Sequence, residues 1–360
     1  MFYERTAVGL DVHSRSVVAH AVDWETGEVF RSRLVPQHPE ILRWVQQLPG
    51  PAAVAYEAGP HGFGLARALE EARVRCVVVA PSKVERPPGD KVKTDKRDAL
   101  RLARLLHIGE LPAVRVPAEW EETARDLVRA RDDVRTDLMR ARHRLAKLLL
   151  RHGYQHDGQA WTMDHERWLR SLRFEDAALR TAFREELDCV LATLARRNRM
   201  DAALEELAER PEWRPTVRRV SCIRGVGVLT AVGLTTEVSD WTRFTGSTIG
   251  SFLGLVPSEN SSGSRRVQGP ITKTGNTHAR RLLVEAAWQQ RRPLHSVGTP
   301  LRKRRDLVCP AVRARAQLAD RRLHHRWVQM DARGKRSTVT AVAIARELAG
   351  WCWSLAVMDG

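Results

Sequence analysis

Four acidic residues have the types and positions that metal-dependent chemistry on phosphates requires. Asp11 and Glu57 each close a short apolar run, so both carboxylates lie at the ends of expected buried strands. Asp95 and Asp98 are three residues apart at the start of an expected helix and therefore share one of its faces. Carboxylates gathered in this way repel one another and resist ionisation unless a cation compensates them. Magnesium is the usual cation for oxygen ligands of this kind, so we expect the four residues to hold metal ions.

A loop rich in serine and glycine is the second candidate for chemistry. It runs from Gly254 to Asn276, and three of its hydroxyls are close in sequence, those of Ser261, Ser262 and Ser264. A hydroxyl that attacks phosphorus needs nearby cations and a group that takes its proton. Three basic side chains could stabilise the charge that develops on a phosphoryl group: Arg265, Arg266 and Lys273. Serines and glycines packed this way usually make only a polar turn, so the pattern leaves both interpretations open.

The elements that must position the acidic residues alternate between strand-like and helix-like patterns. Strands are expected at residues 7–11, 17–22, 29–35, 52–57 and 75–80, and helices at residues 39–48, 63–72 and 95–106. Three strands that follow one another like hairpins, and are then followed by crossovers, predict a mixed sheet covered by helices. The ribonuclease-H-like arrangement is one such α/β sheet.

A long helical pattern follows Pro117. Its apolar residues recur every three or four positions, as in a coiled-coil seam: Leu127, Ala130, Val134, Leu138, Ala141, Leu145 and Leu148. Residues 152–168 interrupt this helix, and a second long helix is expected from about residue 175 to residue 207. The two helices could form an antiparallel hairpin or pair with another subunit. Pro211 cannot continue the second helix, so a third region begins there.

The charge of the chain favours nucleic acid as its partner. The 360 residues carry a net charge of +17, and 43% of them are hydrophobic, which is enough for a sizeable core. Lys and Arg release counterions from phosphates, although charge alone does not distinguish DNA from RNA. The first residues lack the pattern of a signal peptide, and charges interrupt the apolar stretch 341–358, which predicts a cytoplasmic protein without a membrane span. The five cysteines show no paired metal or redox spacing.

Two further segments have patterns that nucleic-acid-binding proteins use. Gly225 and Gly227 resemble the turn of a helix-hairpin-helix element, whose backbone N–H groups approach a phosphate. An ordinary glycine turn between helices explains them equally well. Residues 291–336 contain fourteen Lys and Arg against three Asp, and Arg302-Lys303-Arg304-Arg305 is the densest part. A solvated helix face is the usual explanation of a charge run, but an excess this one-sided favours phosphate contacts.

The histidines give weaker signals. None of the thirteen has a convincing partner at metal-ligand spacing. His13 and His61 follow Asp11 and Glu57 closely and could line the same site, but a structural role is the favoured interpretation of both.

Four motifs, in this order along the chain, resemble those of the DEDD transposases of the insertion-sequence-one-ten family. They are Leu10-Asp11-Val12-His13, Tyr56-Glu57-Ala58-Gly59-Pro60, the segment from Val92 to Ala99, and the segment from Gly254 to Asn276. The resemblance covers almost the whole chain, and the motifs are specific when taken together. One departure is the Gly-Pro pair after Ala58, where many members carry Thr-Gly; it lies outside the set of carboxylates.

The resemblance implies three regions. Residues 1–116 would form a RuvC-like, ribonuclease-H-like catalytic domain, residues 117–210 a coiled-coil helical hairpin, and residues 211–360 a mainly helical transposase domain with the serine loop. It also implies the roles of individual residues. The metal-binding tetrad would be Asp11, Glu57, Asp95 and Asp98. The nucleophile would be Ser262, and the neighbours Ser261 and Ser264 leave that position open by one or a few residues.

An activity follows from the same resemblance. Members of the family excise and insert their element by strand exchange in double-stranded DNA, and those studied use a structured noncoding RNA to choose both DNA sites. Paired Mg²⁺ ions activate the scissile phosphate, and the serine becomes joined to the 5′ phosphate of the DNA. Two metals about 4 Å apart can stabilise the attacking and leaving oxygens together. The family works as an oligomer, so we expect a dimer or a tetramer.

Three functions therefore compete. The leading one is an RNA-guided, Mg²⁺-dependent serine-type DNA recombinase of a mobile element. A RuvC-like endonuclease that hydrolyses DNA junctions with water needs the same four carboxylates but not Ser262. A non-catalytic nucleic-acid-binding protein would need only the basic segments, with a structural role for the acidic residues.

Overall fold

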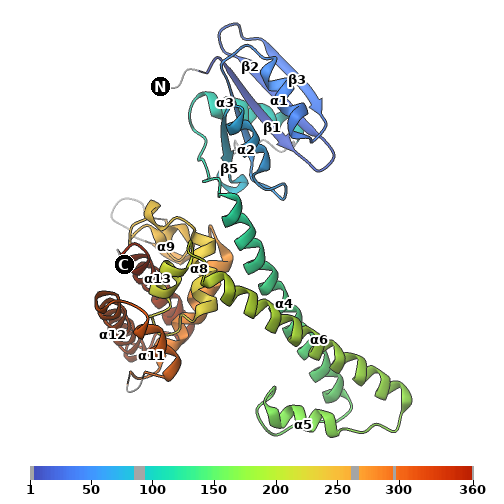
Figure 1. Ribbon diagram of the computed structural model, residues 1–360, viewed down its shortest axis with the longest axis vertical. Helices are drawn as coiled ribbons and strands as arrows, with labels where there is room; N and C mark the ends of the chain where they lie inside the picture. The colour runs from blue at the N-terminus through green and yellow to red at the C-terminus, as the bar shows by residue number, and fades with distance from the viewer. Residues whose placement is uncertain (1–3, 85–93, 261–266, 295–296, 359–360) are drawn as a thin grey trace. The chain divides into compact units, whose positions relative to one another are not determined.

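Figure 1 shows the computed structural model of the chain, which describes residues 4–84, 94–260, 267–294 and 297–358. The chain folds as two compact units, Met1–Ala118 and Glu119–Gly360. The helical hairpin and the C-terminal domain expected from the sequence share the second unit. No helix among the described residues is both long enough and apolar enough to cross a membrane.

The first unit is built on a five-stranded mixed sheet. Its strands are β1 (Thr6–Val12), β2 (Val17–Asp23), β3 (Val29–Leu34), β4 (Ala52–Glu57) and β5 (Arg75–Val79), and their order is β3-β2-β1-β4-β5. The first three strands pair antiparallel, whereas β1 pairs parallel with β4 and β4 pairs parallel with β5. The α/β class and the mixed sheet expected from the sequence are thereby confirmed, and the arrangement is consistent with a ribonuclease-H-like domain.

Different side chains cover the two faces of this sheet. The helices are α1 (His38–Gln46), α2 (Gly64–Glu71) and α3 (Asp95–His107), with a short 3₁₀ turn η1 at Pro81–Lys83. Large side chains such as Leu10 and Tyr56 form one core with residues of α1 and α2. The opposite face carries small residues, among them Ala7, Ala53 and Ala55, and packs against α3. Because these residues are small, the backbone of α3 can lie close to the sheet.

Two long helices open the second unit as an antiparallel hairpin within the chain. They are α4 (Glu119–Arg151) and α6 (Ala177–Ala208), and a shorter helix, α5 (Met163–Ser171), lies in the connection between them. Ion pairs join Arg131 to Asp201 and Arg144 to Glu186, so residue numbers rise along one helix as they fall along the other. The sequence predicts an interruption through residue 168, but the first residues of α5 already lie in that stretch.

The remainder of the second unit is mainly helical. Its elements are α7 (Arg214–Val220), α8 (Val228–Val238), η2 (Trp241–Arg243), α9 (Ile249–Phe252), β6 (Pro257–Glu259), β7 (Gln268–Ile271), α10 (Thr277–Ala287), η3 (Trp288–Arg291), α11 (Thr299–Asp306), α12 (Pro310–Ala332) and α13 (Ser337–Ala356). One hydrophobic core joins α8, α10, α12 and α13, and Trp327 is among its largest buried side chains.

Candidate active site

Asp11 and Glu57 lie at the same end of two neighbouring parallel strands. The pairing of β1 with β4 sets Leu10 beside Tyr56, so the next residues of both strands, Asp11 and Glu57, lie at the same level. Side chains alternate between the faces of a sheet. Asp11 therefore shares its face with Gly9, and Glu57 shares its face with Ala55, which is the face that packs against α3.

Helix α3 contributes the other two carboxylates from its first turn. The Thr94 side chain accepts a hydrogen bond from the backbone N–H of Arg97 at 3.4 Å and so caps the helix directly before Asp95. Asp95 and Asp98 follow on the same face of the helix. The sequence predicted this helix start correctly.

The carboxyl group of Asp11 is affected by both acidic residues of α3. Burial raises the pKa of Asp11 above its usual range, and the negative charges of Asp95 and Asp98 raise it further, while His13 opposes them. Negative charges gathered around Asp11 favour a cation beside it, since a cation relieves their repulsion.

His13 lies with this group of acids, in the position that the alternative interpretation of its sequence allowed. Its Nε2 atom lies 3.2 Å from Asp11 Oδ1 and 3.9 Å from Asp95 Oδ2. The turn between β1 and β2 holds it there, because the backbone N–H of His13 donates a hydrogen bond to the carbonyl oxygen of Ser16 at 3.0 Å. The close spacing of His13 to Asp11 in the sequence was the signal for this contact.

Three side chains can hold one divalent cation. One ligand atom each from Asp11, His13 and Asp95 lies within 4.8 Å of the others. Asp98 is not one of these three residues, but its charge acts on Asp11; its carboxylate is 3.7 Å from Arg101 and is 13% exposed. Carboxylate oxygens suit hard cations such as Mg²⁺, and the added imidazole also suits Mn²⁺ or Zn²⁺. The residues present therefore fit a metal ion.

Strands β6 and β7 form the stem of a β-hairpin, and the predicted nucleophile lies between them in the sequence. Strands β6 and β7 pair antiparallel, with Pro257 beside Ile271 and Glu259 beside Gln268, and Asn260 N–H donates to the Val267 carbonyl oxygen at 2.9 Å. The predicted residues Ser261, Ser262, Ser264, Arg265 and Arg266 all lie outside the described residues. Their roles remain predictions.

Two glycines fix the base of this hairpin. Gly254 and Gly275 both have positive φ, +64° and +70°, and a Cβ on either would collide with backbone, with the Thr274 carbonyl oxygen or the Phe252 carbonyl oxygen respectively. Lys273 N–H donates to the Gly254 carbonyl oxygen at 3.1 Å, while the Lys273 side chain is exposed. The two segments that flank the serine loop are thereby held against each other.

Glu237, a buried acid that the sequence analysis did not identify, holds residues that follow the hairpin in place. The Glu237 carboxylate accepts two hydrogen bonds from Arg129, at 3.0 and 3.1 Å, and also contacts Asn276 and His278, the latter at 3.2 Å. Burial by itself raises the pKa of Glu237, but hydrogen bonds from His278 and Arg129 outweigh it and lower the pKa to about 2. Glu237 is the one charged residue in the sequence of α8, and an isolated charge in an apolar helix is a usable signal.

Gly225 and Gly227 lie in the turn between α7 and α8, as the sequence predicted. Gly225 has a φ of +88°, and a Cβ there would lie 2.4 Å from the carbonyl oxygen of Ala286 in α10. Close packing against α10 accounts for this glycine. Gly227 is the N-cap of α8, and a Cβ on it would meet nothing within 4 Å.

The basic cluster of α11 divides into exposed and buried side chains. Arg302 and Lys303 are exposed. Arg304 donates from Nε to the Ser221 carbonyl oxygen at 2.8 Å. Arg305 is 5% exposed and forms an ion pair with Asp320. The sequence prediction treats these four residues as equivalent phosphate contacts, whereas the guanidinium of Arg305 is already engaged inside the protein.

Comparison with known proteins identifies matching families for most of the chain. Residues 8–153 match a family of DEDD transposases of the IS110 type, and residues 217–296 match the family described as transposase IS116/IS110/IS902. The first match contains the four predicted carboxylates, and the second contains the serine loop.

Similar proteins extend over nearly the full length of the chain. A putative transposase of Sinorhizobium fredii is 38% identical over 98% of this chain and 89% of its own length. A transposase for insertion sequence element IS1533 of Leptospira borgpetersenii is 31% identical over 91% of this chain and 97% of its own length. A probable family 20 transposase of Pseudomonas aeruginosa is 27% identical over 97% of this chain.

Proposed function

The chain belongs to the IS110 family of insertion-sequence transposases, and we propose that it moves its element by Mg²⁺-dependent strand cleavage and exchange through a covalent phosphoserine. As a transposase it acts on DNA, which agrees with its net charge of +17. The metal, the nucleophile and the guide RNA are the parts that we propose beyond family membership.

One observation carries the proposal of a metal site. At the end of β1, one ligand atom each from Asp11, His13 and Asp95 lies within 4.8 Å of the others. We assign Asp11, Glu57, Asp95 and Asp98 to two Mg²⁺ ions, since the strand register sets Glu57 beside Asp11 and the first turn of α3 carries Asp95 and Asp98. Bound Mg²⁺ would neutralise charge on the scissile phosphate and on the leaving oxygen.

The protein's own residues would carry the transfer. The hydroxyl oxygen of Ser262 bonds to phosphorus while the bond from phosphorus to the 3′ oxygen breaks, and the proton lost by the hydroxyl ends on that 3′ oxygen. The product is a 5′ phosphoserine and a free 3′ hydroxyl. Attack by the 3′ hydroxyl of another strand reverses the same bonds, so the exchange needs no external energy source.

Partners follow from the same proposal. Exposed Lys273, Arg302 and Lys303 are suited to contact phosphates of double-stranded DNA or of a noncoding guide RNA. We further propose that the protein works as a homo-oligomer, a dimer or a tetramer, in which the carboxylates of one subunit act with the serine loop of another.

A second candidate function has one observation in its favour. His13 contacts Asp11 and Asp95 and is half exposed, which suits a general base that takes a proton from water. A junction endonuclease that hydrolyses DNA would use such a base and would leave no covalent adduct.

Trapping of a protein–DNA adduct tests the proposal. Purified protein is incubated with Mg²⁺ and the DNA that spans the element ends, and DNA attached to protein is detected on a denaturing gel. We expect Ser262→Ala to abolish the adduct and Asp11→Ala to abolish cleavage. Ser251→Ala, which changes an exposed serine outside the loop, is the matched control. Cleavage that persists in Ser262→Ala without any adduct would support hydrolysis by water instead.

A further inference from the structure

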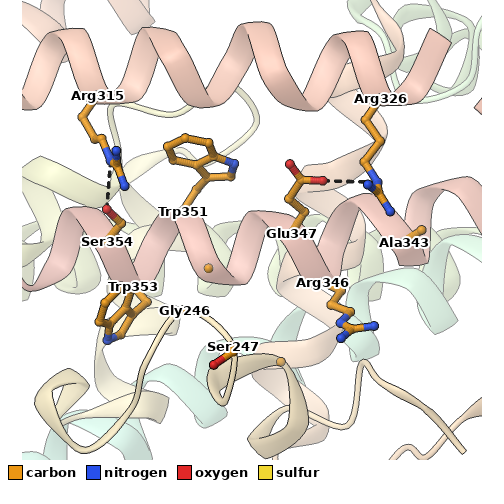
Figure 2. A pocket seen from close by; sticks show the side chains of 12 residues that line it. Gly246, Ser247, Arg315, Arg326, Ala343, Arg346, Glu347, Trp351, Trp353 and Ser354 are labelled. Atoms are coloured by element: carbon orange, nitrogen blue, oxygen red, sulfur yellow. Dashed lines mark hydrogen bonds and ion pairs between the residues drawn. The ribbon is translucent and has the colours of Figure 1, made fainter. Parts of the chain in front are cut away.

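A groove runs along α13 in the second unit. Helix α12 lies on one side of it and the segment of residues 246–250 on the other (Figure 2). Its volume is about 550 Å³, which is within the size range of ligand sites. Most of the groove is formed by α12 and α13, beyond residue 296, where the second family match ends.

Small residues determine the shape of this groove. A Cβ on Gly350 of α13 would lie 3.1 Å from the carbonyl oxygen of Gly246, and a Cβ on Gly246 would lie 3.4 Å from the Trp353 ring. The helix and the segment are therefore closely packed at Gly350. A side chain at residue 350 would press on the backbone of Gly246, whereas a Cβ at residue 246 would make an ordinary contact with Trp353.

A guanidinium and an indole are stacked at one end of the groove. The guanidinium carbon of Arg315 lies 4.8 Å from the ring centroid of Trp351, and its Nε donates a hydrogen bond to Ser354 Oγ at 2.9 Å. Figure 2 shows Arg315 reaching from α12 toward Ser354 and Trp351 on α13. Nucleobases stack on arginine planes and on indoles, so this pair is already arranged to receive a flat ring.

The charge in the groove is positive. Glu347 is the carboxylate among the described residues that line it, and its two oxygens are paired with Arg322 at 2.9 Å and Arg326 at 3.2 Å. Arg346 is exposed and has no hydrogen-bond or ion-pair partner among the described residues (Figure 2). Its five N–H donors therefore remain available for an anion, and a phosphate matches their geometry.

A second hollow continues from the groove toward the stem of the serine hairpin. It shares Arg326, Ala343 and Arg346 with the groove and is lined further by Pro257 of β6 and Ile271 of β7. A chain of several units laid along α13 would pass from the Arg315–Trp351 stack to this hairpin stem. This extended shape suits a polymer better than a small molecule.

We propose that the groove binds an unpaired segment of a nucleic-acid strand, with a phosphate on Arg346 and a base against the stack of Arg315 and Trp351. The ligand class rests on the proposed action on DNA, but not on the serine chemistry. A double helix keeps its bases paired and cannot insert one of them here, whereas a displaced DNA strand and a loop of RNA both can.

Equilibrium binding to the full-length protein tests this proposal. Fluorescence anisotropy is measured in EDTA, where no cleavage occurs, with a short labelled single strand of DNA, the same sequence in RNA, and a duplex. The groove variants are Trp351→Leu and Arg346→Gln. Their controls are Trp351→Phe, which keeps an aromatic ring, and Arg184→Gln, which removes a charge from an exposed arginine of α6 outside the groove.

We expect Trp351→Leu to weaken single-strand binding about 5-fold or more, while Trp351→Phe stays close to the unchanged protein. Arg346→Gln should reduce the slope of log affinity against log salt by about 0.7, and Arg184→Gln should not. The DNA and RNA arms show which strand occupies the groove, and the duplex should be affected least.

Equal effects of Arg346→Gln and Arg184→Gln, or a larger loss for the duplex than for the single strand, would overturn the proposal. If Trp351→Leu unfolds, as a melting curve would reveal, the exposed Arg346 decides the matter. Because the measurement needs neither Mg²⁺ nor Ser262, a failure of the adduct assay leaves it intact, and the reverse also holds.

Discussion

Gly9 of β1 and Ala99 of α3 are in direct backbone contact, since a Cβ on Gly9 would lie 1.9 Å from the Ala99 carbonyl oxygen. Asp11 is two residues beyond Gly9, and Asp98 is the residue before Ala99. The missing side chain at residue 9 therefore sets the distance between the end of β1 and the first turn of α3. A glycine at residue 9 is therefore needed for the acids of β1 and α3 to lie close together at that end of the sheet.

Gly9→Ala should separate these two elements. The new methyl group cannot fit beside the Ala99 carbonyl, so we expect the free energy of unfolding to fall by about 3 kcal/mol and Mn²⁺ binding to weaken. Urea unfolding and calorimetry measure the two effects. Gly59→Ala is the control, because a Cβ there would meet only the Glu57 carbonyl oxygen at an ordinary 3.9 Å. Unchanged metal binding in a destabilised Gly9→Ala would show that the contact matters for stability alone.

His13→Gln should weaken binding of a divalent cation by at least about tenfold, because the imidazole lies 3.2 Å from Asp11 and orients or joins the ligand set. Calorimetric titration with Mn²⁺ measures the affinity. His61→Gln changes an exposed histidine that follows Glu57 closely in the sequence, and it should leave the Mn²⁺ affinity unchanged. If both variants bound Mn²⁺ with equal affinity, His13 would have only the structural role that its sequence suggested.

Glu237→Gln should make the free energy of unfolding depend less on pH in the acid range. The pKa of Glu237 in the folded protein is lowered to about 2, below the value near 4.3 of an unpaired glutamate. Its contribution to the free energy of unfolding is therefore complete above the unfolded pKa and is lost as the pH falls through about 2. The difference corresponds to about 3 kcal/mol at neutral pH. Urea unfolding at several pH values checks the window, and Glu285→Gln, at an exposed acid paired with Arg281, is the control. A loss of stability in Glu237→Gln that does not change with pH would contradict this assignment.

Arg302→Ala and Arg305→Ala should have opposite consequences. Loss of the Arg305 guanidinium leaves buried Asp320 without its ion-pair partner and with the backbone N–H of Arg224 as a remaining donor, so the free energy of unfolding should fall by about 3 kcal/mol. Arg302 is exposed, so its loss should change stability by less than about 0.5 kcal/mol but weaken DNA binding in a salt-dependent way. Chemical unfolding and DNA binding measured on both variants test the division. A stable Arg305→Ala with weakened DNA binding would show that Arg305 contacts DNA as Arg302 is expected to.

Much of the site was accessible from the sequence because its signals are local. Strands closed by Asp11 and Glu57, and a helix that begins at Asp95 behind the Thr94 cap, follow from short patterns of apolar and capping residues. The same patterns gave the mixed sheet and the two long helices. Short motifs in the right order also gave the family, because each motif is a property of consecutive residues.

The sequence by itself thus determined the strands and helices of the first unit, the two long helices, the acids at the ends of the strands and the transposase family. Only the tertiary structure decided which side chains meet. His13 depends on a turn that folds it back over Asp11, and Glu237 depends on partners from α4 and α10 that are far from it in sequence. Arg302 and Arg305 cannot be told apart in the basic run of the sequence, but packing buries Arg305 against Asp320. Burial and distant pairing arise from the whole fold, and they separate residues that a local pattern cannot distinguish.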